Sequence, residues 1–195
     1  MHRTITTQAI LLTLCFGYFI ASGRNLEAER QATPNPYANC DYGYMVAIPT
    51  GLTARIPEYF SHGFEMDLPD RKSRIEIYNA YNMSDSSVPS TVFSYELQLR
   101  KGDRKNWRIV NQRSSREHNL DSIQVTASYA RDGSAWKSEI LIMYRPKQAD
   151  GLGDIVYVVE LSGPAARYNE AISYFNQTVE GISLTELPRG ACTNK

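Results

Sequence analysis

Much of the chain follows the alternation of apolar and polar residues that is typical of β-strands. From Tyr42 to Ile48 every second side chain is large and apolar, which predicts a strand with one buried face. Pro49 and Gly51 come directly after it and predict a turn. Further strand-like runs, alternating or rich in β-branched and aromatic residues, are Leu52–Ile56, Gly63–Leu68, Arg74–Tyr78, Trp107–Asn111, Ile123–Tyr129, Lys137–Tyr144, Asp154–Leu161 and Ile182–Leu187.

Two segments instead have the spacing of an amphipathic helix. In the segment Ser90–Lys101, Val92, Phe93 and Leu97 fall near one face. Ser90 is the expected N-cap, and Gly102 is placed to end the helix.

The second predicted helix follows Ser162-Gly163-Pro164, because proline is preset for a first helical turn. Gly181 is placed to end it. The apolar residues of one helical stripe are Tyr168, Ile172, Phe175 and Val179.

Short turns join most of the predicted strands, and Asp132-Gly133 between two alternating runs predicts a tight hairpin. Short connections favour antiparallel pairing. We therefore expect an α+β fold: a single antiparallel β-sheet packed by about two main helices, in one domain over residues 40–195.

The front of the chain has the three parts of a secretory signal peptide. Arg3 lies before an uncharged apolar core at residues 9–20, and Ala21-Ser22-Gly23 offers small residues for cleavage. We expect residues 1–23 to be removed and residues 24–39 to form a flexible leader to a secreted or periplasmic domain. The alternative is an uncleaved N-terminal membrane anchor.

Two cysteines would remain after cleavage, Cys40 near the start of the domain and Cys192 near its end. In an oxidising compartment an even number favours a disulfide between them. Two free thiols or half of a metal site are the alternatives, but no histidine or further cysteine lies near either residue in the sequence.

The charge balance narrows the class of partner. The chain has 21 basic and 21 acidic residues, so there is no excess of positive charge to neutralise phosphates. We therefore do not expect nucleic acid as a partner, nor a membrane-embedded mature domain. The expected partner is a protein or a small-molecule ligand.

Two segments resemble the Mog/PsbP-like fold, known from an extrinsic subunit of photosystem II and its bacterial relatives. Gly43–Leu52 resembles the opening strand and its Pro-x-Gly turn, and Tyr157–Tyr168 resembles the late strand, small-residue turn and last helix. The resemblance covers roughly residues 41–187. It implies secreted or lumenal binding and assembly, usually without catalysis, and it carries over no functional residues and no cofactor.

The clearest charge signal is a basic stretch between residues 100 and 116. It would suit an acidic partner or an anionic polysaccharide, although a solvated helix end and loop is the simpler interpretation. The residues of the possible patch are Arg100, Lys101, Arg104, Lys105, Trp107 and Arg108, followed by Arg113 and Arg116.

Catalytic signals are few. There is no Gly-x-Ser-x-Gly motif, and His62 and His118 have no motif partners in the sequence. A hydrolase with one of them as base, assembled only in the fold, is the alternative to a non-catalytic binding or assembly domain. A membrane-tethered structural envelope protein is a third possibility.

Acidic and amide residues give weaker signals. Glu58, Glu65, Asp67 and Asp70 are interpreted as a solvated outer strand face, and Asp150–Asp154 as a turn with too few ligands for calcium. We therefore predict no catalytic, cofactor or metal residues. The glycosylation sequons at Asn82 and Asn176 are meaningful only if the source glycosylates secreted proteins.

Overall fold

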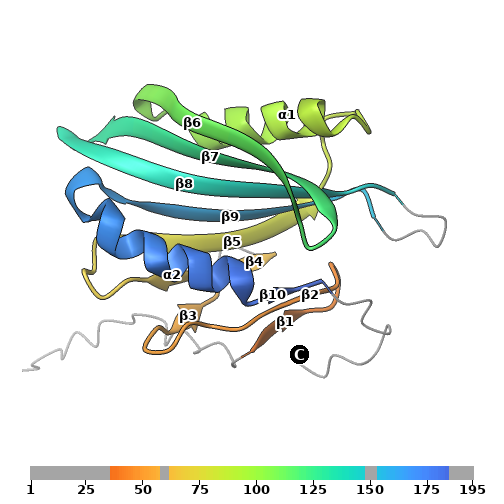
Figure 1. Ribbon diagram of the computed structural model, residues 1–195, viewed down its shortest axis with the longest axis horizontal. Coiled ribbons are helices and arrows are strands. Elements are labelled where there is room, and N and C mark those ends of the chain that lie inside the picture. Colours follow the sequence, from red (N-terminus) through yellow and green to blue (C-terminus); the bar gives the residue numbers. More distant parts are fainter. Residues whose placement is uncertain (1–35, 58–61, 148–152, 185–195) are drawn as a thin grey trace, which may run out of the picture.

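The computed structural model describes residues 36–57, 62–147 and 153–184. These residues form an α+β fold with a seven-stranded and a three-stranded sheet, both antiparallel (Figure 1). The order in the large sheet is β3-β4-β5-β9-β8-β7-β6. Its strands are β3 (Ala54–Arg55), β4 (Gly63–Asp67), β5 (Arg74–Tyr81), β6 (Lys105–Glu117), β7 (Leu120–Arg131), β8 (Ser134–Arg145) and β9 (Ile155–Pro164).

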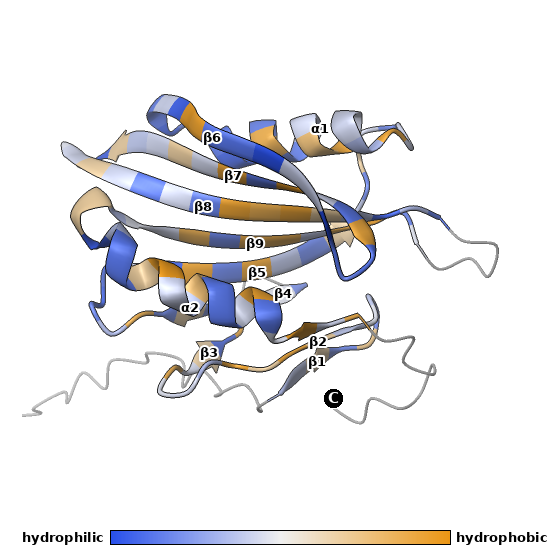
Figure 2. Ribbon diagram, viewed as in Figure 1, coloured by the Kyte–Doolittle hydropathy of each residue, from blue (hydrophilic) through white to orange (hydrophobic). Residues whose placement is uncertain are grey.

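The two helices lie on opposite faces of the large sheet. Helix α1 (Pro89–Lys101) packs on the face that includes Ile140, whereas α2 (Tyr168–Glu180) packs on the face that includes Leu141. Consecutive residues of a strand point to opposite faces, so β8 and β9 are buried on both sides. Figure 2 shows the apolar residues that this requires along the middle of β8.

The prediction of a single sheet is wrong, because β1 (Tyr37–Asn39), β2 (Tyr44–Val46) and β10 (Ile182–Ser183) form a sheet of their own. Beside α2, this small sheet covers the same face of the large sheet. The ring of Tyr37 lies 4.5 Å from that of Phe64 in β4, measured between centroids. The small sheet thus buries apolar area on this face of the large sheet that helix α2 leaves uncovered.

Strand β1 lies in the segment that we expected to be a flexible leader. The segment is mostly polar and has no apolar period, but the side chain of Tyr37 is buried in the core. One aromatic residue in a three-residue strand is too weak a pattern to reveal pairing from sequence.

The strand and hairpin predictions otherwise agree with the structure. Asp132 and Gly133 connect β7 and β8 with positive φ values of 50° and 73°, as a tight two-residue hairpin requires. Gly102 caps the end of α1, and Gly181 that of α2. Of the expected last strand, residues 182 and 183 form β10, and residues 185–187 lie outside the described part.

Three boundaries differ from expectation. Helix α1 begins at Pro89, with Val88 as its N-cap rather than Ser90. Pro164 ends β9, and a 3₁₀ turn at Ala165–Arg167 comes before α2. Strand β6 runs over 13 residues, far beyond the predicted five-residue segment, because it lies at the sheet edge and needs no apolar face to continue.

Candidate functional site

The basic stretch between residues 100 and 116 divides into an inner and an outer group. Arg100, near the C-terminal end of α1, and Arg104, in the turn between α1 and β6, point inward to Glu160 of β9. Arg104 Nη1 donates to Glu160 Oε1 at 2.5 Å, and Arg100 Nη1 lies 3.7 Å from Glu160 Oε2. Glu160 is only 1% exposed, so both guanidinium groups are committed to a buried carboxylate.

Aromatic rings hold the same two arginines. The guanidinium carbon of Arg100 lies 4.3 Å from the ring centroid of Tyr78, and that of Arg104 lies 4.9 Å from the Tyr129 centroid. The Trp107 ring is 5.4 Å from Arg104. These contacts stabilise the cations in place, so Arg100, Arg104 and Trp107 of the predicted patch have a structural role.

The outer group faces solvent. Lys101 ends α1, and Lys105 and Arg108 lie at the start of β6, all three exposed. Arg113 and Arg116 continue this outer group along the strand. Strand β6 carries four basic residues and one acidic residue, Glu117.

Strand β6 is an edge strand. Among the strands that the structure describes, it pairs with β7 on one side and with none on the other. Its register with β7 shifts near residues 105–111 and is then regular to Glu117. An edge of this kind presents free backbone donors and acceptors, and its basic residues and bulges limit indiscriminate pairing.

A groove of ≈ 480 Å³ lies between α1 and β6. Its apolar lining includes Phe93 and Leu97 of α1 and Ile109 of β6, and Ile109 is 42% exposed. Lys101 contributes a charge to the lining. The groove and the β6 edge therefore form a continuous surface with both apolar and basic residues, which we call the α1–β6 surface.

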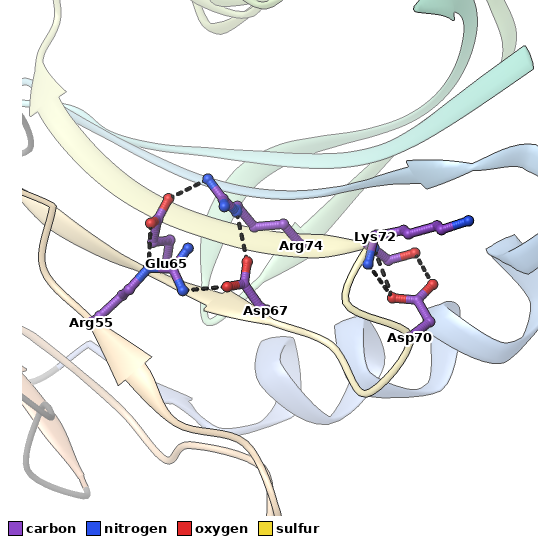
Figure 3. A network of polar contacts seen from close by, with 7 residues as sticks. Arg55, Glu65, Asp67, Asp70, Lys72 and Arg74 are labelled. Carbon is purple, nitrogen blue, oxygen red and sulfur yellow. Dashed lines mark hydrogen bonds and ion pairs between the residues drawn. The ribbon is translucent and has the colours of Figure 1, made fainter. Parts of the chain in front are cut away.

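Beyond the end of α1, the same face of the large sheet carries a polar network (Figure 3). Glu65 of β4 accepts a hydrogen bond from Arg55 Nε at 2.6 Å and from Arg74 Nη1 at 2.7 Å. Asp67 is paired with the same two arginines. Burial opposes ionisation of Asp67, but the two arginines outweigh it and lower its pKa.

This network corrects our interpretation of the acidic stretch as a solvated strand face. Glu65 is 3% exposed and is held between two arginines rather than by water. Asp70 accepts from the backbone N–H groups of Lys72 and Ser73 and so fixes the β4–β5 turn (Figure 3). Glu58 lies outside the described residues.

Three glutamates lie side by side across the sheet. Glu65 is in register with Glu76 of β5, and Glu76 is in register with Glu160 of β9. We call these residues the glutamate row. Like charges in directly opposed positions destabilise a sheet unless cations separate them. Glu65 and Glu160 each have two arginines, whereas Glu76, in the middle, has no direct ion pair among the described residues.

Glu76 opens into a second groove of ≈ 710 Å³, which we call the Glu76 groove. Ser162 lies beside Glu76 in its lining, and the α1–β6 turn and the β7–β8 hairpin supply the walls. Burial, followed by the charge of Glu160, raises the pKa of Glu76. A carboxylate that costs stability and faces a groove is a candidate for function.

The sequence analysis missed Glu76 and Glu160. A signal for Glu160 does exist, because a single acidic residue interrupts the otherwise apolar run from Val156 to Leu161 in a central strand. Glu76 carried no such signal, since it occupies the polar position of an ordinary alternating strand. Their adjacency depends on the pairing of β5 with β9, which lie far apart in the chain.

The two histidines do not form a catalytic pair in the described part of the chain. His62 is exposed and packs its ring 5.2 Å from that of Tyr42. His118 is exposed in the β6–β7 turn, with Nε2 at 3.2 Å from the carbonyl oxygen of Val179. Neither ring is bonded there to a carboxylate, so no observation favours the hydrolase alternative.

Asp154, at the end of the segment interpreted as a turn with too few ligands for calcium, has a structural role. Its Oδ1 atom accepts from Tyr144 Oη at 2.9 Å and from Asn82 Nδ2 at 3.0 Å. Asp150 lies outside the described residues. The amide of the Asn82 sequon is thus engaged within the fold, whereas Asn176 is exposed on α2.

Other predictions lie partly or wholly outside the described ranges. These are the signal peptide, most of the leader and Cys192, so the Cys40–Cys192 disulfide stays a prediction. Within residues 36–57, 62–147 and 153–184, no cluster of three or more candidate metal ligands occurs. Over the same residues, no helix combines the length and apolar character needed to cross a bilayer.

No protein-family model matches the sequence, and no curated protein matches it. Solved structures do match the fold. Cyanobacterial PsbP (CyanoP) from Synechocystis sp. PCC 6803 has a TM-score of 0.57 at 14% identity, over 79% of this chain and 94% of CyanoP. LpqN of Mycobacterium tuberculosis, described as involved in cell envelope biogenesis, has a TM-score of 0.55 at 13% identity, over 73% and 83%.

A Pseudomonas aeruginosa protein of unknown function matches with a TM-score of 0.50 at 10% identity, over 74% of this chain and 98% of that protein. At these identities the similarity concerns the fold and not the activity. The expected resemblance is confirmed at that level: the chain has a PsbP-like α+β fold.

Proposed function

We propose that the chain is a non-catalytic extracytoplasmic binding domain whose α1–β6 surface docks an extended acidic segment of a partner protein. The observation that carries this proposal is a long, basic edge strand beside an apolar groove. Export is proposed from the signal-like residues 1–23 and is consistent with the fold's similarity to LpqN, which is described as involved in cell envelope biogenesis.

The backbone of β6 supplies the first part of the interaction. An extended segment can add to an exposed sheet edge through main-chain hydrogen bonds, and alternate side chains then provide specificity. The regular part of β6, from Asn111 to Glu117, offers such an edge without a register shift. The shifted part near Lys105 and Arg108 would end the added strand.

Charge supplies the second part. Arg108 and Arg113 are exposed on β6, and Lys101 lies at the end of the neighbouring helix. An acidic segment would be attracted by these groups, which would increase its association rate most at low ionic strength. Arg100 and Arg104, bound to Glu160, are not part of the proposed surface.

The groove supplies the third part. Alternate residues of an added strand point to the face that carries α1, where Phe93, Leu97 and Ile109 line the groove. Apolar residues of the partner would be buried there, while acidic residues on the other face approach Arg113. The preferred partner sequence therefore alternates acidic and apolar residues.

The test uses a labelled synthetic peptide in which glutamate alternates with valine, titrated into the mature domain and followed by fluorescence anisotropy. We expect binding that weakens with salt and falls roughly tenfold, or ~1.4 kcal/mol, in Arg108→Glu/Arg113→Glu. The matched control Lys72→Glu/Lys147→Glu changes net charge equally at exposed sites away from β6 and should bind as the wild type does.

Three results would contradict the proposal. One is equal binding by the double variant and the wild type. Another is equal binding of a peptide in which lysine replaces glutamate. The third is binding of heparin without binding of the peptide, which would favour an anionic polysaccharide as the partner.

A further inference from the structure

The Glu76 groove lies on the α1 face of the large sheet beside the start of β6, where Lys105 belongs both to its rim and to the α1–β6 surface, and it is not needed for the proposed function. Its floor is formed by Glu76 and Ser162 on the paired central strands β5 and β9. Its rim carries acidic and basic residues in mixture: Asp103, Arg104, Lys105, Arg131 and Asp132. The volume of ≈ 710 Å³ is within the range of small-molecule sites.

The floor of this groove lacks a positive charge. The glutamate row has arginines at both ends, Arg55 and Arg74 on Glu65, and Arg100 and Arg104 on Glu160. Within the described residues no cation contacts Glu76 directly, although its neighbours in the row are both carboxylates. A cation at Glu76 would complete the alternation of charge across the sheet.

A buried oxygen atom next to Glu76 without a hydrogen bond also indicates a missing partner. Glu160 is 1% exposed, and its Oε2 atom has no hydrogen-bond partner in the described structure, although Arg100 Nη1 lies 3.7 Å from it. Glu160 is the register neighbour of Glu76 and points to the same face of the sheet. A buried carboxylate oxygen without a donor needs an explanation, and a ligand donor is one.

The chemistry of these groups selects the ligand. Glu76, the Oε2 atom of Glu160 and the hydroxyl of Ser162 are all able to accept hydrogen bonds on this face, and an ammonium group has three N–H donors. A metal ion would require more oxygen ligands in one place, and the described residues hold no such cluster.

We propose that the Glu76 groove binds a compact organic cation with a primary ammonium group, which is held by Glu76 and stabilised by Glu160 and Ser162. Binding reduces the repulsion among the three carboxylates and supplies a hydrogen bond to the Oε2 atom of Glu160, whose Oε1 atom already accepts from Arg104 and Ser138. Ordered water alone would supply the donor but not the charge, so a charged and a neutral probe distinguish the two.

The test compares 1,4-diaminobutane with the neutral butane-1,4-diol, and with magnesium or calcium chloride at matched ionic strength. Binding to the mature domain is measured by calorimetry and by NMR shifts of the Glu76, Glu160 and Ser162 amides. We expect the diamine to bind, with shifts confined to the groove, and the diol to bind at least tenfold more weakly.

Two variants assign the site. Glu76→Gln keeps the shape of the side chain and should weaken diamine binding at least tenfold. Asp85→Asn removes an exposed acid outside the groove and should leave binding unchanged. Circular dichroism of both variants establishes that they fold.

Four outcomes would overturn the proposal: no diamine binding, equal binding of the diol, equal binding by Glu76→Gln, or saturable binding of the metal ion instead. None depends on the β6 peptide, so this proposal and the proposed function can fail independently.

Discussion

Glu65, Glu76 and Glu160 occupy equivalent positions on adjacent strands, yet their surroundings give them different properties. Glu65 and Glu160 are each fixed by two arginines. Glu76 is influenced by the charges of Arg74, Arg100, Arg104, Glu65 and Glu160 but forms no ion pair with any of these arginines. A paired buried carboxylate stabilises its partners, whereas an unpaired one destabilises the fold when it ionises.

This difference predicts the pH dependence of stability. The folded-state pKa of Glu76 is raised above its ordinary value of 4.5. The stability that the protonated Glu76 side chain contributes is therefore fully present below about pH 4.5 and is lost as the pH rises through the folded-state pKa. Glu76→Gln cannot ionise and avoids this loss. We expect its melting temperature to exceed that of the wild type by up to about 4 °C at pH 7.5.

The check is differential scanning calorimetry of both proteins from pH 4 to pH 8 without ligand. The difference between them should shrink towards acid pH, with Asp85→Asn as the control. A difference that is constant with pH, or one that grows towards acid, would show that ionisation of Glu76 does not destabilise the fold.

Residue roles were the least predictable part of the molecule. The basic stretch is visible in the sequence, but nothing there separates Arg104, which is bound to Glu160, from Lys105, which faces solvent. That separation arises where α1 ends against β9. Long-range pairing therefore decides which charges are available, and a local pattern cannot report it.

At the scale of elements, close backbone approach limits the sequence of β4 and β5. Gly63 begins β4 opposite Tyr78, in a position where an added Cβ atom would overlap the carbonyl oxygen of Ile77 and lie 2.8 Å from the Cα atom of Tyr78. Both obstacles are backbone atoms, which cannot move aside as a flexible side chain can. Glycine is thus needed at this point of the hairpin.

We therefore expect Gly63→Ala to lower the free energy of unfolding by about 1–3 kcal/mol, because the two strands must separate locally. Urea denaturation followed by tryptophan fluorescence measures the change. Gly163→Ala combined with Ser73→Gly serves as the comparison, since the obstacle at Gly163 is chiefly the side chain of Ser73. A Gly63→Ala midpoint equal to that of the wild type would show that the approach is not tight.

Elements were predictable where one face is buried. The β7–β8 hairpin has a clear period and a turn sequence, and both strands lie close to their expected positions. Strand β6 was underestimated because edge strands keep polar residues on both faces. Strand β1 was missed for the related reason that three residues pairing with β2 need only one apolar anchor, Tyr37.

At the scale of the whole molecule, the number of sheets could not be read from the chain. The predicted runs include most strands, but nothing in them shows that β2 leaves the large sheet and pairs with β10 instead. Packing explains the arrangement, because α2 and the small sheet together cover one face. The fold class and the two helices can be predicted from local periodicity. The division into two sheets depends instead on the apolar area of the large sheet that α2 alone does not cover.

Export and the disulfide can be tested with one measurement. We expect the exported protein to begin at Arg24 and to lack two hydrogen atoms because Cys40 and Cys192 are joined. Intact mass spectrometry before and after reduction gives both results. Reduction should also lower stability, with about 5 kcal/mol as the upper limit for a loop of about 150 residues.

A start at Met1 would contradict cleavage, and an unchanged mass on reduction would contradict the bond. The double variant Cys40→Ser/Cys192→Ser provides the control, since its mass and its stability should not respond to the reductant.

The order of strands also has a kinetic consequence. Strands β6 to β9 form a meander of sequential neighbours, but β5 must pair with β9, which is synthesised after α1 and the other three strands of that meander. Closing such a long loop is entropically slow compared with forming hairpins. A chain emerging N-terminus first thus leaves the pairing edge of β5 open until β9 arrives, and this interval is when a chaperone would be needed.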